Sequence, residues 1–431
     1  NNIGLLGITA DGYSFIMTSF INGWTLLNSP GLVGLPTLEI SVANINGLTY
    51  ICYPGINIYT INLSGSLTLS TTSQIAVGNT TTTLNAAWPY TTGSYLLTYY
   101  TTSGTAQVIA QLTNGSTTVT ISSAGAAQST NLLLVISPML VPASINWGTT
   151  TNNNGITVTN SMITSITDCF NVLLATDGYS LYNSSFSNPL DFNIANTLIT
   201  GANSQIPSDT KGPIIALAKI GVGFGVFTSA NVVSGQWSSN IQFPWVFRAI
   251  ANSGGVKSIT AISEGGPEGT VYAWTSAGLQ QLSVLKADDI FGTLTDYLSG
   301  RLYEDWNDTL MEPFDVPLYN DMNVKIQWAG NRYLIVSYGP NNLTYAYVYD
   351  TSLKQWGKLR NIHVCAFNIS TSADGNKYSY TNIYGTAYAT LSGVAYNEMS
   401  YFSQSSSSVK RTLGLLKADG TILMPIMDEY N

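Results

Sequence analysis

The stretch YAYVYDTSLKQW, residues 345–356, decides the fold: it places a tyrosine at every second position, then passes through a polar turn and ends on a tryptophan. Successive side chains of a β-strand point to opposite faces, so a period of two indicates a strand. Two short strands around a turn recur elsewhere in the chain, in residues 48–61, 170–186, 222–237, 270–283 and 332–356. We therefore expect a repeated unit built from β-hairpins.

Turn signals support this expectation. Asn-Gly and Asp-Gly pairs tolerate positive φ at both turn positions and mark tight hairpins between apolar runs. The chain contains many such pairs, at residues 11–12, 22–23, 46–47, 114–115, 154–155, 177–178, 374–375 and 419–420.

The spacing of the repeats predicts a β-propeller. Phe170, Gly223, Val271 and Tyr333 hold equivalent positions in four repeats and are separated by 53, 48 and 62 residues. Propeller repeats of about 40–50 residues each form one four-stranded blade, with variable loops between blades. Stacking of blades would bury their apolar faces, and we expect Trp237 and Trp356 to act as wedges between blades.

Residues 66–137 have a different texture, with strand-like runs at about ten-residue spacing, which indicates a small antiparallel β-sandwich inserted into the propeller. The predicted fold is thus all-β. It consists of an N-terminal propeller part (1–65), the inserted sandwich (66–137) and the remaining blades (138–431), with about six blades in total.

One segment has a helical pattern. Near residues 286–303, Ile290, Leu294, Leu298 and Leu302 recur every four positions, after Asp288 in an N-cap position. We expect a helix there, carried on a loop.

Charge excludes several classes of function. Charged residues make up 9% of the chain, the net charge is -8, and the first Lys or Arg is Lys211. Because affinity for nucleic acid comes chiefly from Lys and Arg that neutralise phosphates, residues 1–210 cannot form a conventional DNA or RNA binder.

Cys52, Cys169 and Cys365 lie far apart and form no CxxC pair, so we expect reduced, buried thiols rather than a zinc site or a disulfide framework. No run of 18 apolar residues and no basic signal-peptide region are present, which predicts a soluble chain made in a reducing cytoplasm, without membrane insertion.

Acidic residues gather in one place. Residues 286–321 hold nine of the 23 acids: Asp288, Asp289, Asp296, Glu304, Asp305, Asp308, Glu312, Asp315 and Asp321. A paired-carboxylate glycosidase centre or a calcium site would need such residues. However, the spacing of a calcium loop is absent, and a catalytic pair would more naturally come from separate blades. We predict instead a solvated loop that faces a partner, formed by Asp288, Asp289, Asp296, Glu304, Asp305, Asp308, Glu312 and Asp315.

Other candidate sites are weaker. The one histidine, His363, lies in a strand-like context and is expected to be structural, which removes motifs that need two histidines. Trp24, Trp147, Trp274 and Trp328 stand in alternating runs and are expected in the core rather than on display for carbohydrate stacking. The glycine-rich residues 221–225 lack a following helix, so we expect no phosphate cradle there. We predict no catalysis, cofactor or metal.

Several stretches resemble the tail hub or nozzle proteins of short-tailed bacteriophages, a group that includes the packaged-DNA stabilisation proteins. These stretches are DGYSLYNSSFSNPLDFN (177–193), GTVYAWTSAGLQQLS (269–283) and YAYVYDTSLKQWGKL (345–359). The insert, from NTTTTLNAAWPY onward, is similar to a small β-domain of phage structural proteins.

The resemblance implies a virion protein, assembled in the host cytoplasm into a homo-hexamer of the phage tail. Such a nozzle would lie below the portal and adaptor rings, retain packaged DNA and carry fibres, spikes or a needle, while DNA passes through without specific binding. An acidic to neutral wall fits this role, because it denies phosphates any counter-charge. The alternative is a carbohydrate-binding or carbohydrate-hydrolysing propeller used in host-receptor recognition.

Overall fold

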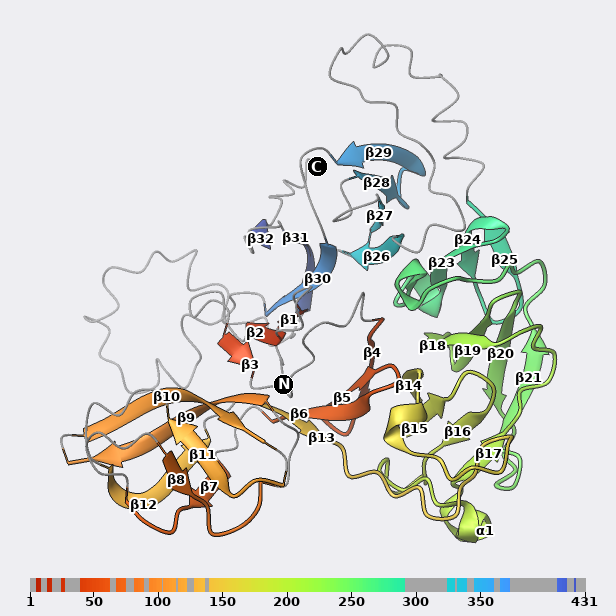
Figure 1. Ribbon diagram of the computed structural model, residues 1–431. Helices are drawn as coiled ribbons and strands as arrows, with labels where there is room; N and C mark the ends of the chain where they lie inside the picture. Colours follow the sequence, from red (N-terminus) through yellow and green to blue (C-terminus); the bar gives the residue numbers. More distant parts are fainter. Residues whose placement is uncertain are drawn as a thin grey trace, which may run out of the picture. The chain divides into compact units, whose positions relative to one another are not determined.

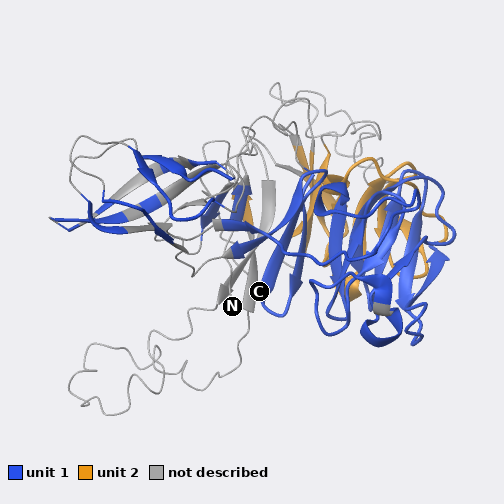
Figure 2. Ribbon diagram, turned by 60° about the horizontal axis from the view of Figure 1, so that its bottom comes forward, with its two compact units in different colours: residues 1–250 blue, residues 251–431 orange. Residues whose placement is uncertain are grey.

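The structure is a computed structural model of the 431-residue chain (Figure 1). It describes residues 5–8, 14–17, 25–27, 39–62, 67–74, 81–88, 93–102, 104–113, 115–121, 128–135, 139–290, 324–329, 332–338, 345–359, 365–372, 409–416 and 422–423. The chain divides into two compact units, residues 1–250 and 251–431, which Figure 2 colours separately.

The described residues are almost entirely strands and turns, as the sequence predicts. The helical elements are single turns: η1 (Asn160–Met162), η2 (Ile194–Asn196), α1 (Thr197–Thr200), η3 (Ile259–Ala261) and η4 (Pro267–Gly269). Within the part of the chain that the structure describes, no helix has the length and apolar character needed to cross a lipid bilayer.

Unit 1 contains three four-stranded antiparallel sheets, a three-stranded sheet and a six-stranded sheet among its described residues. The three-stranded sheet comprises β1 (Leu5–Ile8), β2 (Ser14–Met17) and β3 (Thr25–Leu27). The first four-stranded sheet comprises β4 (Ser41–Ile45), β5 (Leu48–Tyr53), β6 (Asn57–Asn62) and β13 (Met139–Pro142). The second comprises β14 (Ser165–Cys169), β15 (Val172–Thr176), β16 (Leu181–Asn183) and β17 (Asn203–Gln205). The third comprises β18 (Ile214–Ile220), β19 (Gly223–Thr228), β20 (Val232–Trp237) and β21 (Trp245–Ala249).

The sheets of unit 1 stack face to face in chain order. On β5, Tyr50 and Cys52 pack against residues of the second sheet, whereas their neighbours Ile51 and Tyr53 pack against Ile16 of the three-stranded sheet. Strand β15 repeats this division, because alternate side chains face the sheet before it and the sheet after it. A strand buried on both faces explains why these segments are near-continuous apolar runs.

A hydrogen bond from a serine joins successive sheets. Ser41 Oγ accepts from the backbone N–H of Ile166 at 2.8 Å, and Ser165 Oγ accepts from that of Leu217 at 3.0 Å. Each serine lies on the first strand of one sheet, and its donor lies on the first strand of the next, so the first strands β4, β14 and β18 lie side by side. Both serines are buried, so the bond satisfies a backbone donor that water cannot reach.

The insert lies between the third and fourth strands of the first four-stranded sheet. It contains β7 (Leu67–Ser70), β8 (Thr81–Thr83), β9 (Gly93–Thr101), β10 (Gly104–Leu112), β11 (Thr118–Ile121) and β12 (Gln128–Val135). Its core includes Trp88, Leu97 and Val119.

The predicted two-sheet sandwich is wrong for this insert, which forms a single six-stranded sheet in the order β7-β12-β9-β10-β11-β8. A bridge between Thr71 and Leu84 joins its two edges, and Thr72 N–H donates to the Thr83 carbonyl at 2.8 Å. Short strands at about ten-residue spacing occur both in two-sheet sandwiches and in single sheets that curl on themselves, so the spacing does not distinguish them. Strands as long as β9 and β10 allow a twisted sheet to curl until its edges pair, which removes exposed strand edges.

Unit 2 repeats the stacked arrangement. Its first sheet comprises β22 (Ile262–Ser263), β23 (Val271–Thr275), β24 (Gly278–Leu282) and β25 (Ala287–Asp289). Its second comprises β26 (Lys325–Ala329), β27 (Tyr333–Tyr338), β28 (Tyr345–Asp350) and β29 (Gln355–Leu359). A three-stranded sheet follows, with β30 (Cys365–Ser372), β31 (Val409–Leu416) and β32 (Ile422–Leu423). The serine bond occurs here too, because Trp328 N–H donates to Ser263 Oγ at 2.7 Å.

Three of the four positions predicted to be equivalent occupy equivalent places. Gly223, Val271 and Tyr333 each begin the second strand of a four-stranded sheet, and Phe170 precedes the second strand of another by two residues. Tyr347 and Tyr349 of the opening stretch lie on β28, buried on one face with Trp356.

The helix predicted near residues 286–303 is wrong at its start. Asp288 lies in β25, opposite Gln281, instead of capping a helix. Ile290 N–H continues this pairing by donating to the Leu279 carbonyl at 2.9 Å, so the free edge of β24 competes successfully with the helical pattern. The remainder of the predicted helix, from residue 291, lies outside the described residues.

Candidate functional site

The acidic residues predicted to face a partner are only partly described. Asp288 and Asp289 lie exposed on the edge strand β25, and Lys286 Nζ pairs with Asp288 at 2.9 Å. An exposed pair of this kind contributes little to stability. Asp296, Glu304, Asp305, Asp308, Glu312 and Asp315 lie outside the described residues. Among all the residues that the structure describes, no group of three or more His, Cys, Asp or Glu side chains is placed to hold a metal ion.

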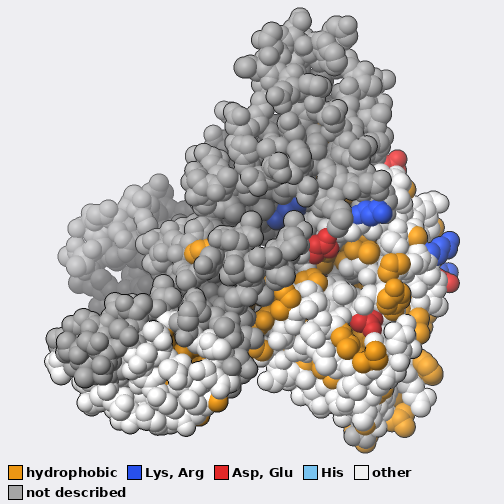
Figure 3. Space-filling model, viewed as in Figure 1, with side chains coloured by type: hydrophobic (Ala, Val, Ile, Leu, Met, Phe, Trp, Pro, Cys, Tyr) orange, Lys and Arg blue, Asp and Glu red, His pale blue; other side chains and the backbone are white. Residues whose placement is uncertain are grey.

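The strongest candidate site is an aromatic pocket in unit 1. Phe170, Phe186 and Trp237 line a cavity of about 170 Å³ where the second and third four-stranded sheets meet. Phe170 is 58% exposed and Trp237 is 39% exposed. Figure 3 shows hydrophobic side chains reaching the surface in the region where Figure 1 places β14–β21.

The rings of this aromatic pocket form a connected cluster. The Phe186 and Trp237 rings meet edge to face, with centroids 5.0 Å apart, and the Phe170 and Trp237 centroids are 6.4 Å apart. Trp245 lies behind them, stacked on Phe170 at 6.5 Å and edge to face with Trp237 at 5.5 Å. Edge-to-face and offset contacts are the geometries that ring quadrupoles favour, so the cluster holds its exposed members in place.

Local backbone structure positions each ring. Phe170 and Asn171 form the two-residue turn between β14 and β15, with φ of 50° and 64°. Trp237 ends β20 opposite Trp245 on β21. Phe186 follows β16 and lies over Gly201, where a Cβ atom would come within 1.9 Å of the ring. Any side chain at position 201 would therefore displace Phe186 from the pocket.

The sequence located only part of this site. Trp237 lies between two sheets, as the wedge prediction requires, but its exposure makes it part of a surface. Trp356 is buried against Tyr347 and Tyr349 of its own sheet, in a core cluster that it shares with Trp274 of the preceding sheet. Trp147, Trp274 and Trp328 are buried, as predicted, whereas Trp24 and His363 lie outside the described residues.

Phe170 was missed as a site residue. A left-handed backbone at a bulky residue cannot be anticipated from residue preferences, and the contact with Trp237 joins residues 67 positions apart.

A second feature of unit 1 is a polar row on the first strands, formed by Asn44, Asp168 and Lys219. Each residue stands two positions before the first hairpin turn of its sheet. Asn44 N–H donates to Asp168 Oδ1 at 3.1 Å, and Lys219 Nζ pairs with Asp168 Oδ2 at 2.6 Å. The row ties three sheets together and offsets the charge of Asp168.

The thiols of Cys52 and Cys169, on or beside these first strands, are unreactive. Cys52 and Cys169 are free and buried, as predicted from their spacing. The pKa of each thiol is raised to about 12, chiefly by burial, and the nearby Asp168 carboxylate contributes to the rise at Cys169. Both are therefore protonated at neutral pH and poor nucleophiles. The side chain of Cys365 lies outside the description.

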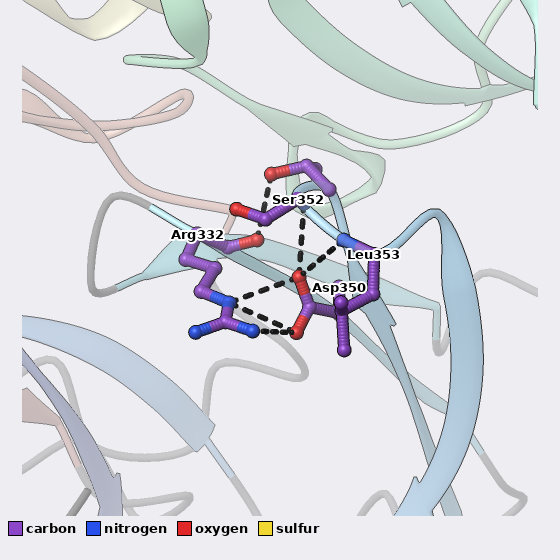
Figure 4. A network of polar contacts seen from close by, with 5 residues as sticks. Arg332, Asp350, Ser352 and Leu353 are labelled. Atoms are coloured by element: carbon purple, nitrogen blue, oxygen red, sulfur yellow. Dashed lines mark hydrogen bonds and ion pairs between the residues drawn. The ribbon is translucent and has the colours of Figure 1, made fainter. Parts of the chain in front are cut away.

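In unit 2, a charged network fixes the turn that follows β28 (Figure 4). Arg332 Nε donates to both Asp350 oxygens, at 3.0 and 2.9 Å, and the N–H groups of Ser352 and Leu353 donate to Asp350 Oδ1. Burial alone would raise the pKa of Asp350, but these donors together hold it below the ordinary value of 3.8. The network is a structural clamp for the polar turn of the opening stretch.

Comparison with known proteins gives only distant likenesses. No protein-family model matches the chain, and no curated protein sequence matches it significantly. Among solved structures, AztD of Citrobacter koseri has a TM-score of 0.32 at 11% identity, over 82% of this chain and 83% of that one. The phage phi92 endosialidase has a TM-score of 0.25 at 10% identity, over 98% and 69%. PorZ of the Porphyromonas gingivalis type-IX secretion system has a TM-score of 0.21 at 12% identity, over 86% and 54%. TM-scores this low identify neither a family nor a function.

Proposed function

We propose that the sheets are blades of a β-propeller and that the chain is a structural protein of a phage virion. In this role it forms a homo-hexameric tail nozzle, extends the portal–adaptor channel, retains packaged DNA and carries fibres, spikes or a needle. It works as a scaffold, without catalysis or a cofactor.

The observation that carries the proposal is the repeated link between successive sheets. The same serine hydrogen bond joins first strands twice in unit 1 and once in unit 2. A repeat that places each first strand against the next suits sheets arranged about an axis. Because the links are buried and the sheets are packed on both faces, they stiffen a wall that must withstand internal pressure.

Charge supports the same role. The base-free residues 1–210 give a passing duplex no cation to hold it, and Asp168, on a first strand, is offset by Lys219. A conduit made from such surfaces lets DNA slide. The insert, built on its own core between two strands of one sheet, offers a separate surface for a neighbouring virion component.

Assembly state is the direct test. Purified full-length protein should sediment as a single large species at micromolar concentration, and negative-stain images should show six-fold rings with a central opening. A monomer at every concentration, or turnover of host polysaccharide that is lost on replacing a single acid within residues 286–321, would contradict the proposal.

A further inference from the structure

The aromatic pocket lined by Phe170, Phe186 and Trp237 has the dimensions of a single-ring subsite. Its volume of about 170 Å³ is below the roughly 300–1,000 Å³ of pockets that enclose a drug-sized ligand. A ligand that fits must therefore place one small ring or group between the aromatic faces and leave the rest outside.

The backbone conformation at Phe170 is energetically unfavourable for a residue whose only role is to form a turn. Its φ of 50° is left-handed, which Asn and Gly adopt readily and a bulky aromatic residue does not. Phe170 is nevertheless 58% exposed, so the burial of its ring offsets little of this unfavourable free energy. Residues held in unfavourable backbone conformations cluster at functional sites, which directs attention to the exposed ring itself.

The three segments that build the pocket carry no charged side chain of their own, and charged residues begin immediately outside them, at Asp177, Asp191 and Arg248. These segments, residues 170–176, 184–190 and 236–247, contain no Asp, Glu, Lys or Arg. An anionic or cationic ligand would find no counter-charge in these segments. Protein–protein interfaces are typically enriched in Arg beside their aromatic residues, and these segments contain none. The polar groups available are amides and hydroxyls, which both donate and accept hydrogen bonds.

Unused hydrogen-bonding capacity lies next to the rings. Trp245 Nε1 and Gln205 Oε1 are buried without a hydrogen-bond partner, and Gln205 Nε2 donates to the Trp245 carbonyl at 3.5 Å. Both atoms lack exposed surface, so a ligand would reach them only after the rings shift, and the hydrogen-bonding groups of the segments themselves are amides and hydroxyls.

We propose that the aromatic pocket binds a neutral carbohydrate, with the apolar face of one sugar ring against Phe170 and Trp237 and its hydroxyls toward the surrounding amides. This proposal goes beyond the scaffold function and does not depend on it, because a nozzle subunit or an isolated chain would present the same pocket.

A printed array of neutral and anionic glycans, probed with labelled full-length protein, tests the proposal. We expect binding to a subset of neutral glycans, confirmed for a soluble oligosaccharide of the same type by quenching of tryptophan fluorescence. Binding only to anionic glycans, or to none, would overturn it.

Phe170→Asn is the discriminating variant, because Asn accepts the left-handed turn while removing the ring. Glycan affinity should fall by at least about tenfold with the midpoint of urea unfolding unchanged or higher. Tyr179→Ala is the matched control, since Tyr179 is 60% exposed but does not line the pocket, and it should bind as the wild type does.

Trp237→Ala should repeat the loss seen with Phe170→Asn. If the two variants instead change the sedimentation of the assembly while no neutral glycan binds, the surface is a contact between copies and the carbohydrate proposal fails. Ring formation by the wild type is measured separately, so the two proposals can fail independently.

Discussion

Ser165 illustrates how one small side chain can hold two sheets together. It is fully buried in β14, and its Oγ accepts from Leu217 N–H at 3.0 Å. Replacement with alanine would leave that N–H buried without a partner, at a cost of about 1–3 kcal/mol. Ser165→Ala should therefore lower the free energy of unfolding by this amount in urea titrations.

Ser41→Ala and Ser263→Ala should behave in the same way, because both serines make the equivalent bond. Ser208→Ala, at an exposed position of unit 1, is the control and should change stability by no more than about 0.5 kcal/mol. Equal losses of stability at Ser208 and Ser165 would show that the serine hydrogen bonds between sheets do not contribute to the free energy of unfolding.

Asp350 predicts a pH dependence. Its pKa is lower in the folded chain than the ordinary 3.8, so the folded state favours the carboxylate. The resulting stabilisation is fully present above the unfolded pKa and is lost as the pH falls through the folded pKa. The stability difference between wild type and Asp350→Asn should be largest near neutral pH and should shrink below about pH 4. Chemical denaturation from pH 7 to pH 2.5 measures it, and a difference that grows in acid would contradict the assignment.

At the scale of elements, the insert is the clearest unit to remove. Strands β6 and β13 pair with Asn62 opposite Met139, so residues 63–138 can be replaced by an Asn-Gly turn that closes a hairpin. Val141 is the partly buried residue of β13 that packs against the core of the insert. We expect the shortened chain to keep its β-sheet circular dichroism and to lose no more than about 1–2 kcal/mol of stability.

A cavity within the insert should have an equally local effect. Leu97→Ala removes a fully buried side chain from the insert core and should destabilise the insert by about 2–5 kcal/mol, while amides of β14 and β15 keep their hydrogen-exchange protection. Leu173→Ala, in the core between two stacked sheets, should reduce that protection instead. Loss of protection in β14 with both variants would mean that the insert and the stack unfold together.

The sequence predicts elements better than contacts between them. Asn46-Gly47 marks the turn between β4 and β5, with φ of 52° and 78°, because local residue preference and tertiary structure agree there. The Phe170-Asn171 turn departs from the same rule, because a phenylalanine occupies a left-handed position that residue preferences assign to Asn or Gly. Ser41 and Ser165 look like ordinary polar residues within apolar runs, and only the stacking of first strands gives them a role. In the same way, Asp288 fits a helix cap until β24 offers it a strand partner.

At the scale of the whole molecule, the distribution of charge leads to a prediction about DNA. With a net charge of -8 and no Lys or Arg before Lys211, we expect the chain to release few counterions from a duplex and therefore not to bind it tightly. Fluorescence anisotropy with a labelled 30-base-pair duplex should therefore show no binding at micromolar protein, even at about 50 mM salt, where electrostatic affinity is strongest. Ser73→Lys, at an exposed site in the insert, adds one cation and should leave this result unchanged, because a single phosphate contact contributes little. Tight binding that weakens steeply between 50 and 200 mM salt would instead mean that the later basic residues form a continuous cationic surface, and a freely sliding conduit would then be the wrong function for this chain.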